Sequence, residues 1–205
     1  RQLGEQMGQI PGAFGEAERA MRGELDFASA LRERVGLIKG LSLHALARVY
    51  AERVRLNPGA KALLATMRKS GAYTLLVSGG FTYFTTRVAA DAGFEENRGN
   101  ILRDNGDALT GEVGEPVLGR DAKLQALTDT AARRELAVGE TLAVGDGAND
   151  LAMIQLAGLG VAYHAKPVVA EAAESAANGA SVAHGDLTTL LYLQGYRQSE
   201  IVKDT

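Results

Sequence analysis

Strand-like and helix-like segments alternate along the chain from residue 57 to its end. Short apolar runs such as Tyr73–Val77 and Leu142–Val144 stop at Ser or Gly, and segments with helical spacing of apolar residues follow them. This alternation is typical of an α/β fold, in which a doubly wound, mostly parallel sheet is covered by helices and ligands bind beyond the carboxyl ends of the strands. Strands are predicted at 73–77, 141–144, 159–163 and 180–183, and helices at 59–69, 81–91, 121–135, 149–157, 167–176 and 186–194.

The first 56 residues lack this alternation, and from Phe14 to about Arg55 the pattern is helical instead. Phe27, Leu31 and Val35 lie on one helix face, and a second amphipathic segment follows Ser42. We therefore predict a small helical cap domain over 1–56 and an α/β core over 57–205. Within the core, the turn-forming pair Asn105-Gly106 between strand-like flanks predicts a hairpin.

Composition excludes several classes of protein. The formal charge of −3 and the pI near 5.7 give no basic surface for nucleic acid, which is not an expected partner. No apolar run reaches the roughly 18 residues that a membrane helix needs, and the chain has no cysteine for disulfides or thiolate metal sites. We expect a cytoplasmic protein without membrane contacts.

The stretch GDGAND, residues 145–150, places two carboxylates after a buried strand. Asp146 stands at the strand end and Asp150 at the start of the next helix, so the two converge on a small volume. Hard oxygen donors without histidine or cysteine suit Mg²⁺, which commonly takes one or two carboxylates and fills its shell with water and phosphate. The same residues also fit a plain turn followed by an acidic first helical turn.

A second stretch, SGGF at 78–81, follows another predicted strand. The Ser78 hydroxyl and the backbone N–H groups of Gly79 and Gly80 are suited to a phosphate at the start of a helix, although a simple N-cap serine with turn glycines is the alternative. Lys123 lies at the start of a predicted helix, where the helix dipole disfavours a cation. Its position suggests an anion nearby.

These segments resemble known motifs. SGGF, the lysine that opens a helix and VGDGANDLAMI resemble motifs two, three and four of the haloacid dehalogenase superfamily. The stretch AMRGELDFASALRERVGLIKGL resembles the helical cap of the phosphoserine phosphatases in that superfamily, and AKP at 165–167 fits the same group. The likeness extends from about Ala20 to the last helix, and the cap stretch is its most specific part.

The resemblance implies roles for individual residues around the phosphoryl group. Ser78, Gly79 and Gly80 would bind the phosphoryl group, and Lys123 would steady it against the nucleophile. Asp146 would bind Mg²⁺, with Asp150 close behind it, and Asn149 would contact the substrate.

The resemblance also implies how the cap recognises the substrate. Met21 and Phe27 match apolar substrate contacts, and Arg34 matches the residue that takes the carboxylate of the amino acid. A guanidinium can bind a carboxylate through two parallel hydrogen bonds. Packing inside the cap is the alternative for Met21 and Phe27, and a solvated helix position for Arg34.

The first motif of the superfamily, an Asp-x-Asp pair that supplies the nucleophile and the acid/base, does not occur in this sequence. We expect it, together with the substrate-binding glutamate of the family, upstream of Arg1. The polypeptide as printed would then be inactive alone.

The resemblance implies a Mg²⁺-dependent phosphoserine phosphatase, a monomer or homodimer that hydrolyses O-phospho-L-serine through an aspartyl-phosphate in serine biosynthesis. Two alternatives remain: a related enzyme for another small phosphomonoester, and a non-catalytic homologue that binds phosphorylated ligands.

Overall fold

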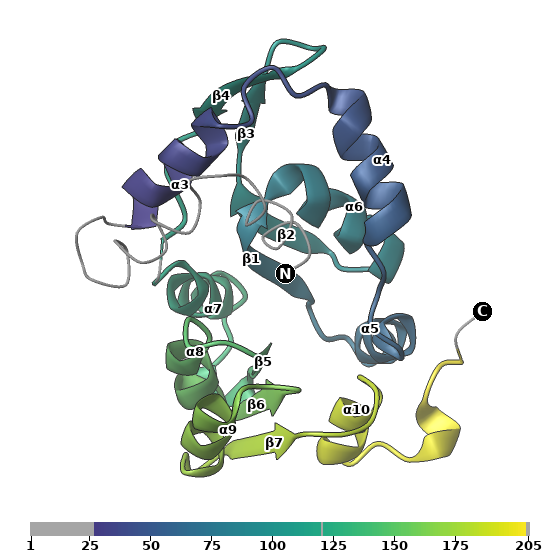
Figure 1. The fold of residues 1–205 in the computed structure, drawn as a ribbon. Helices are drawn as coiled ribbons and strands as arrows, with labels where there is room; N and C mark the ends of the chain where they lie inside the picture. The colour runs from purple at the N-terminus through teal and green to yellow at the C-terminus, as the bar shows by residue number, and fades with distance from the viewer. Residues whose placement is uncertain (1–26, 120, 204–205) are drawn as a thin grey trace. The chain divides into compact units, whose positions relative to one another are not determined.

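The computed structural model describes residues 27–119 and 121–203. Met21 and the residues around it lie outside these ranges. The helices are α3 (Phe27–Gly36), α4 (Leu43–Arg53), α5 (Ala60–Lys69), α6 (Thr82–Ala92), α7 (Ala122–Arg133), α8 (Leu151–Leu156), α9 (Pro167–Glu174) and α10 (Thr189–Leu193), with short 3₁₀ turns at Val138–Glu140 and Gln198–Glu200 (Figure 1). The strands are β1 (Leu75–Phe81), β2 (Glu96–Asn100), β3 (Leu102–Asp104), β4 (Leu109–Val113), β5 (Leu142–Gly145), β6 (Leu159–Tyr163) and β7 (Gly179–Val182).

The described chain divides into two compact units, and each is described by itself. The first contains the described residues up to Leu56 together with Ser78–Val88 and Asn97–Gly119. The second contains Asn57–Val77, Ala89–Glu96 and the described residues from 121 onward. The expected division into a cap over 1–56 and a core over 57–205 stays a prediction.

In the second unit, β5, β6 and β7 form a parallel sheet in that order. One face of β6 carries Val161 and Tyr163, which pack with Leu63 of α5 and with Leu190 and Leu191 of α10. Successive side chains of a strand point to opposite faces, so Ala162 faces the other way.

The face that carries Ala162 packs with Ile154 of α8 and with Val169 and Ala173 of α9. These two helices run along the sheet in Figure 1. Helices therefore cover both faces of this sheet, which confirms the predicted α/β class.

In the first unit, the described helices α3 and α4 pack against a hairpin. Leu31 and Val35 of α3 and Leu46 of α4 share one core with Leu102 and Leu109 of the hairpin β3–β4. Two short amphipathic helices cannot enclose a core alone, so the hairpin supplies the missing layer.

Local signals in this unit act as the sequence predicts. The Ser42 hydroxyl caps α4 by accepting a hydrogen bond from the Ala45 N–H at 3.2 Å. The hairpin turn contains Gly106 with φ at 96°, a value that glycine adopts without steric cost.

The described strands belong to three separate sheets, β1–β2, β3–β4 and β5–β6–β7. β1 and β5, which the sequence places in one sheet, therefore have different neighbours, because β1 pairs with β2 and β5 pairs with β6. β1 also continues through Ser78, Gly79 and Gly80 to Phe81, beyond the predicted end at residue 77.

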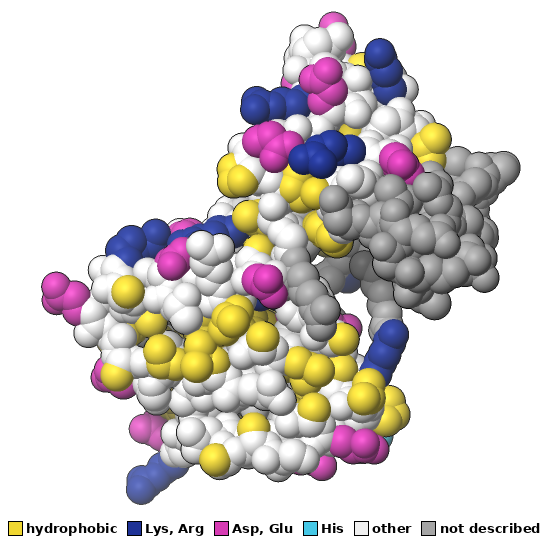
Figure 2. Space-filling view, turned by 90° about the vertical axis from the view of Figure 1, so that its left-hand side faces the viewer, with side chains coloured by type: hydrophobic (Ala, Val, Ile, Leu, Met, Phe, Trp, Pro, Cys, Tyr) yellow, Lys and Arg dark blue, Asp and Glu magenta, His cyan; other side chains and the backbone are white. Residues whose placement is uncertain are grey.

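The surface of the second unit carries single exposed apolar side chains, including Leu136, Leu156 and Val168. Figure 2 shows such side chains in yellow, interspersed with polar and charged ones. Scattered exposed apolar residues are usual on protein surfaces. No helix within the described ranges combines the length and the apolar character needed to cross a membrane.

The packing of α8 on β6 generates a stability prediction. A Cβ atom added at Gly160 would lie 1.9 Å from the carbonyl oxygen of Ile154, so Gly160→Ala forces the backbone of the sheet and helix apart. Overpacking of a core typically costs about 1 to 3 kcal/mol, and backbone overlap belongs at the upper end. We expect a clear fall in the urea midpoint of unfolding.

The control is Gly139→Ala, because an added Cβ there meets no atom within 4 Å. It should leave the midpoint nearly unchanged. Equal midpoints for the two variants would contradict the packing described for Gly160.

Candidate functional site

The loop after β5 is organised by the buried carboxylate of Asp150, which is 1% exposed. Its Oδ2 accepts hydrogen bonds from the backbone N–H groups of Asp146 at 3.2 Å and of Gly147 at 3.0 Å. The Nζ of Lys123, from the first turn of α7, donates to its Oδ1. Asp150 thus closes the loop on itself and ties it to α7.

The Lys123–Asp150 ion pair is largely buried, so the loss of one partner would be costly. The side chains of Lys123 and Asp150 are 15% and 2% exposed, so both charges are largely removed from water. A charge buried in this way is tolerated only when it is paired and hydrogen-bonded. Loss of either partner would leave an uncompensated buried charge.

Asp146 differs from Asp150 in its surroundings. It directly follows Gly145, the last residue of β5, and its side chain is exposed. Its carboxylate accepts no hydrogen bond from the described residues, whereas its backbone N–H is held by Asp150. The Asp146 carboxylate is therefore free to bind a ligand, whereas the Asp150 carboxylate stabilises the loop.

Glycine is required where the strand enters this loop. A Cβ atom added at Gly145 would lie 2.3 Å from the Cβ and Cγ of Asp150. The close approach of Asp150 to the end of β5 therefore depends on the missing side chain, which explains the first glycine of the GDGAND stretch.

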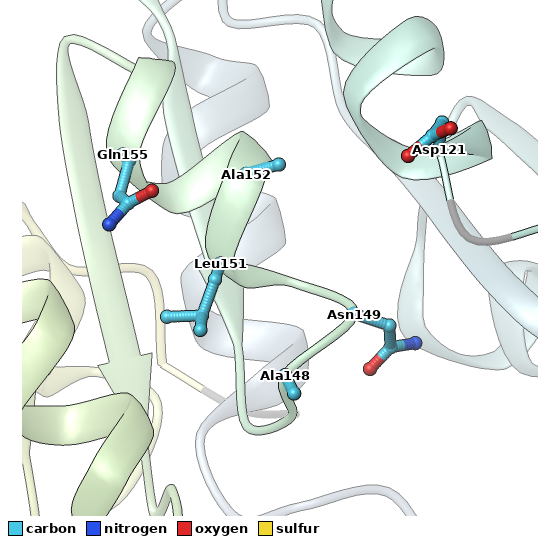
Figure 3. A pocket seen from close by; sticks show the side chains of 6 residues that line it. All are labelled: Asp121, Ala148, Asn149, Leu151, Ala152 and Gln155. Carbon is cyan, nitrogen blue, oxygen red and sulfur yellow. The ribbon is translucent and has the colours of Figure 1, made fainter. Parts of the chain in front are cut away.

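Asn149 lines a pocket beside this loop. The pocket has a volume of about 270 Å³, and Figure 3 shows its lining side chains from the loop, from α8 and from the start of α7: Asp121, Ala148, Asn149, Leu151, Ala152 and Gln155. Lys123, Asp146 and Asp150 do not line it. Asn149 is exposed, in a position open to a ligand.

The first unit contains the other predicted phosphate-binding residues. The Ser78 Oγ accepts a hydrogen bond from the Gly80 N–H at 3.0 Å, and Gly79 and Gly80 are exposed at the end of β1. The Phe27 side chain of α3 lies over this segment, since a Cβ added at Gly79 would be 3.9 Å from its Cζ. Phe27 is 41% exposed, so its side chain remains partly open to solvent.

Arg34 lies seven residues after Phe27, on the same face of α3. At 1.5 Å rise per residue the two positions are about 10 Å apart along the helix axis. The Arg34 Nε donates to the Ala30 carbonyl at 3.2 Å, which uses one of the five guanidinium donors.

The structure thus brings the predicted residues together in two sets. Lys123, Asp146 and Asp150 meet in the second unit with Asn149 beside them, and Phe27 meets Gly79 in the first. A meeting of Ser78 with Lys123, which belong to different units, stays a prediction.

Sequence reasoning missed Asn100, the last residue of β2. Its side chain is fully buried at 0% exposure and bridges two backbone groups. The Nδ2 donates to the Gly79 carbonyl at 2.9 Å, and the Oδ1 accepts from the Leu118 N–H at 2.8 Å. The polar segment ENRGN carries no strand pattern or motif that could have indicated this role.

Comparisons with known proteins show the family of the chain. Residues 1–155 match the family of haloacid dehalogenase-like hydrolases. A phosphoserine phosphatase from Polaromonas is 43% identical over 181 residues, which cover 86% of this chain and 75% of that protein.

Solved structures give the same picture. The unliganded structure of a probable phosphoserine phosphatase from Vibrio cholerae has a TM-score of 0.83 and 34% identity, covering 93% of this chain and 57% of that one. A substrate-bound phosphoserine phosphatase complex has a TM-score of 0.75 and 30% identity, covering 92% of this chain and 87% of that one. The chain therefore belongs to the haloacid dehalogenase-like hydrolase family, and the relatives it resembles here are phosphoserine phosphatases.

Proposed function

We propose that this chain is part of a Mg²⁺-dependent phosphoserine phosphatase, which hydrolyses O-phospho-L-serine to L-serine and phosphate. The observation that carries the proposal is the buried Lys123–Asp150 pair beside the exposed Asp146 at the end of β5. Its relatives support the substrate, since they bear the name phosphoserine phosphatase at 43% identity and one neighbour holds substrate.

The donor set at β5 fits Mg²⁺. No group of three or more His, Cys, Asp or Glu side chains gathers in the part of the chain that the structure describes, so a cage built wholly from protein is not the arrangement supported here. Mg²⁺ is commonly held by one or two carboxylates, with water and substrate phosphate as further ligands. A single free carboxylate at Asp146 meets this requirement.

The two aspartates then have different roles. A carboxylate offers about four acceptor positions, and Asp150 uses three of them for Lys123 and two backbone N–H groups. We assign Asp146 as the direct metal ligand and Asp150 as the residue that orients the loop. The Asp150 carboxylate keeps at most one free acceptor position. The metal, when bound, supplies positive charge next to the phosphoryl oxygens.

Lys123 adds a second positive charge. Asp150 holds its Nζ in place, and an ammonium group has three donors, so it can bind a phosphoryl oxygen while it keeps the ion pair. The Ser78 hydroxyl and the Gly79 N–H are proposed to bind the other phosphoryl oxygens, whereas the Gly80 N–H already donates to the Ser78 Oγ. Positioned charges and donors of this kind lower the barrier because they need no rearrangement during the reaction. No described residue is assigned as the nucleophile.

The substrate's amino acid part is proposed to bind along α3. Phe27 lies over Gly79, and Arg34 lies two turns further along the same face of α3. Beyond the phosphate-binding segment, α3 therefore offers first an apolar contact and then a cation. Arg34 would bind the substrate carboxylate. Met21 is proposed as a further apolar contact, and Asn149 as a polar one. The cytoplasmic location and the monomeric or homodimeric state stay predictions.

The function is tested by phosphate release from a panel of phosphomonoesters, with the protein in its complete natural form. Phosphoserine should be hydrolysed faster than phosphoethanolamine, which lacks the carboxylate. EDTA should abolish the activity and Mg²⁺ restore it. Preference for a different ester would support the related-enzyme alternative, and phosphate binding without turnover would support the non-catalytic one.

Asp146→Asn should abolish most turnover, because the neutral amide loses the charge that holds the metal. Charge stabilisation by a bound metal is worth several kcal/mol, so we expect a fall in kcat of about a hundredfold or more. Asp129→Asn on the exposed side of α7 is the matched control and should keep full activity. Normal turnover of the Asp146 variant at saturating Mg²⁺ would refute the assignment.

Arg34→Ala should raise KM for phosphoserine by about tenfold to a hundredfold, the effect of losing a hydrogen bond between charged groups. The KM for phosphoethanolamine should change little. Arg48→Ala, at an exposed position of α4, serves as the control. An equal loss on both substrates would mean that Arg34 supports the fold and not recognition.

A further inference from the structure

The peptide between Gly79 and Gly80 is held from one side by Asn100. The Gly79 carbonyl accepts a hydrogen bond from the Asn100 Nδ2 at 2.9 Å. The other end of the same amide accepts from the Leu118 N–H at 2.8 Å, so both ends of this buried side chain are used. Because one partner is a carbonyl and the other an N–H, only this orientation of the amide satisfies both.

The same peptide acts on Ser78 from its other side. In a planar trans peptide the C=O and the following N–H point in opposite directions, so a Gly79 carbonyl turned to Asn100 directs the Gly80 N–H away from it. There the Gly80 N–H donates to the Ser78 Oγ at 3.0 Å. Asn100 therefore fixes the serine oxygen through one intervening peptide.

This contact determines what the Ser78 hydroxyl can do. A hydroxyl has one hydrogen to donate and two lone pairs that accept. The Gly80 N–H occupies a lone pair, and no described group accepts the hydrogen. The hydroxyl is thus left as a donor for an anion.

The two glycines explain why an external restraint is needed. Glycine adopts many backbone conformations, so a Gly-Gly peptide rotates more freely than others. The close approach of β2 supports the restraint, since a Cβ added at Gly99 would lie 3.1 Å from the Gly80 carbonyl oxygen.

We propose that Asn100 is a positioning residue for phosphoryl binding, which holds the Gly79–Gly80 peptide so that the Ser78 hydroxyl donates to a phosphoryl oxygen. The inference rests on the proposed function, because that function supplies the anion for Ser78. Its distinctive consequence is that Asn100 acts through Ser78.

The test measures binding of inorganic phosphate by calorimetry, in Mg²⁺, with the protein in its complete natural form. Asn100→Ala should weaken phosphate binding about tenfold, the loss expected for one hydrogen bond to a charged group. Ser78→Ala should weaken it by a similar factor. The double variant should be no weaker than Ser78→Ala alone, a non-additivity that a merely structural role would not produce.

Two further variants keep the test valid if Asn100→Ala does not fold. Asn100→Leu keeps about the size of the side chain but has no donor for the Gly79 carbonyl, so it should show the same loss. Asn97→Asp, in the same strand, keeps the Oδ1 that accepts from Thr85 and should bind phosphate normally.

The outcomes separate the two proposals. Normal phosphate binding by the Asn100 variants, or losses that add in the double variant, would overturn the inference and leave the proposed function intact. Absence of phosphate binding by the wild-type protein would overturn both.

Discussion

The buried ion pair between Lys123 and Asp150 is the interaction on which the site at β5 depends. The Asp150 carboxylate sits in the interior at 1% exposure, where an unpaired charge would be very costly. Lys123 and two backbone N–H groups offset that cost and, in doing so, fix the course of the loop. The pair also holds the lysine ammonium near the end of the strand. Asp146 then remains exposed with its carboxylate free.

In the first unit, too, one buried polar side chain holds the backbone while a neighbouring residue stays available to a ligand. A buried side chain, Asn100, holds the backbone of Gly79, and its half-buried neighbour Ser78 keeps its hydrogen for a ligand. In both units the residue that we expect to touch phosphate or metal is held by a buried polar group one step away. Buried groups of this kind are rigid because every hydrogen bond they lose is expensive.

The sequence predicted those elements whose local chemistry is strong. The bounds of β6, 159–163, are as predicted, because a five-residue apolar run between Gly158 and the segment that leads to Pro167 is too short for a helix and typical of a buried strand. The start of α4 after Ser42 and the hairpin at Asn105-Gly106 follow from capping and turn chemistry.

Elements that depend on tertiary pairing were not predictable in this way. Ser78 and the glycines after it look like a strand end, but pairing of β1 with β2 carries the strand on to Phe81. β2 itself is polar and has no periodic signal. The motif likewise indicated two aspartates but not that one is buried and the other free, since burial depends on the packing of α7 against α8.

A double-mutant cycle between Lys123 and Asp150 tests the central claim most directly. Lys123→Met and Asp150→Asn, alone and together, would be compared by urea unfolding and by phosphate binding in Mg²⁺. Removing one partner of a buried pair commonly costs about 3 to 5 kcal/mol, whereas replacing both can be nearly neutral. The account predicts that the double variant loses much less free energy of unfolding than the sum of the losses of the two single variants, and that it loses phosphate binding. Additive changes in stability, or unchanged phosphate binding by the double variant, would contradict it.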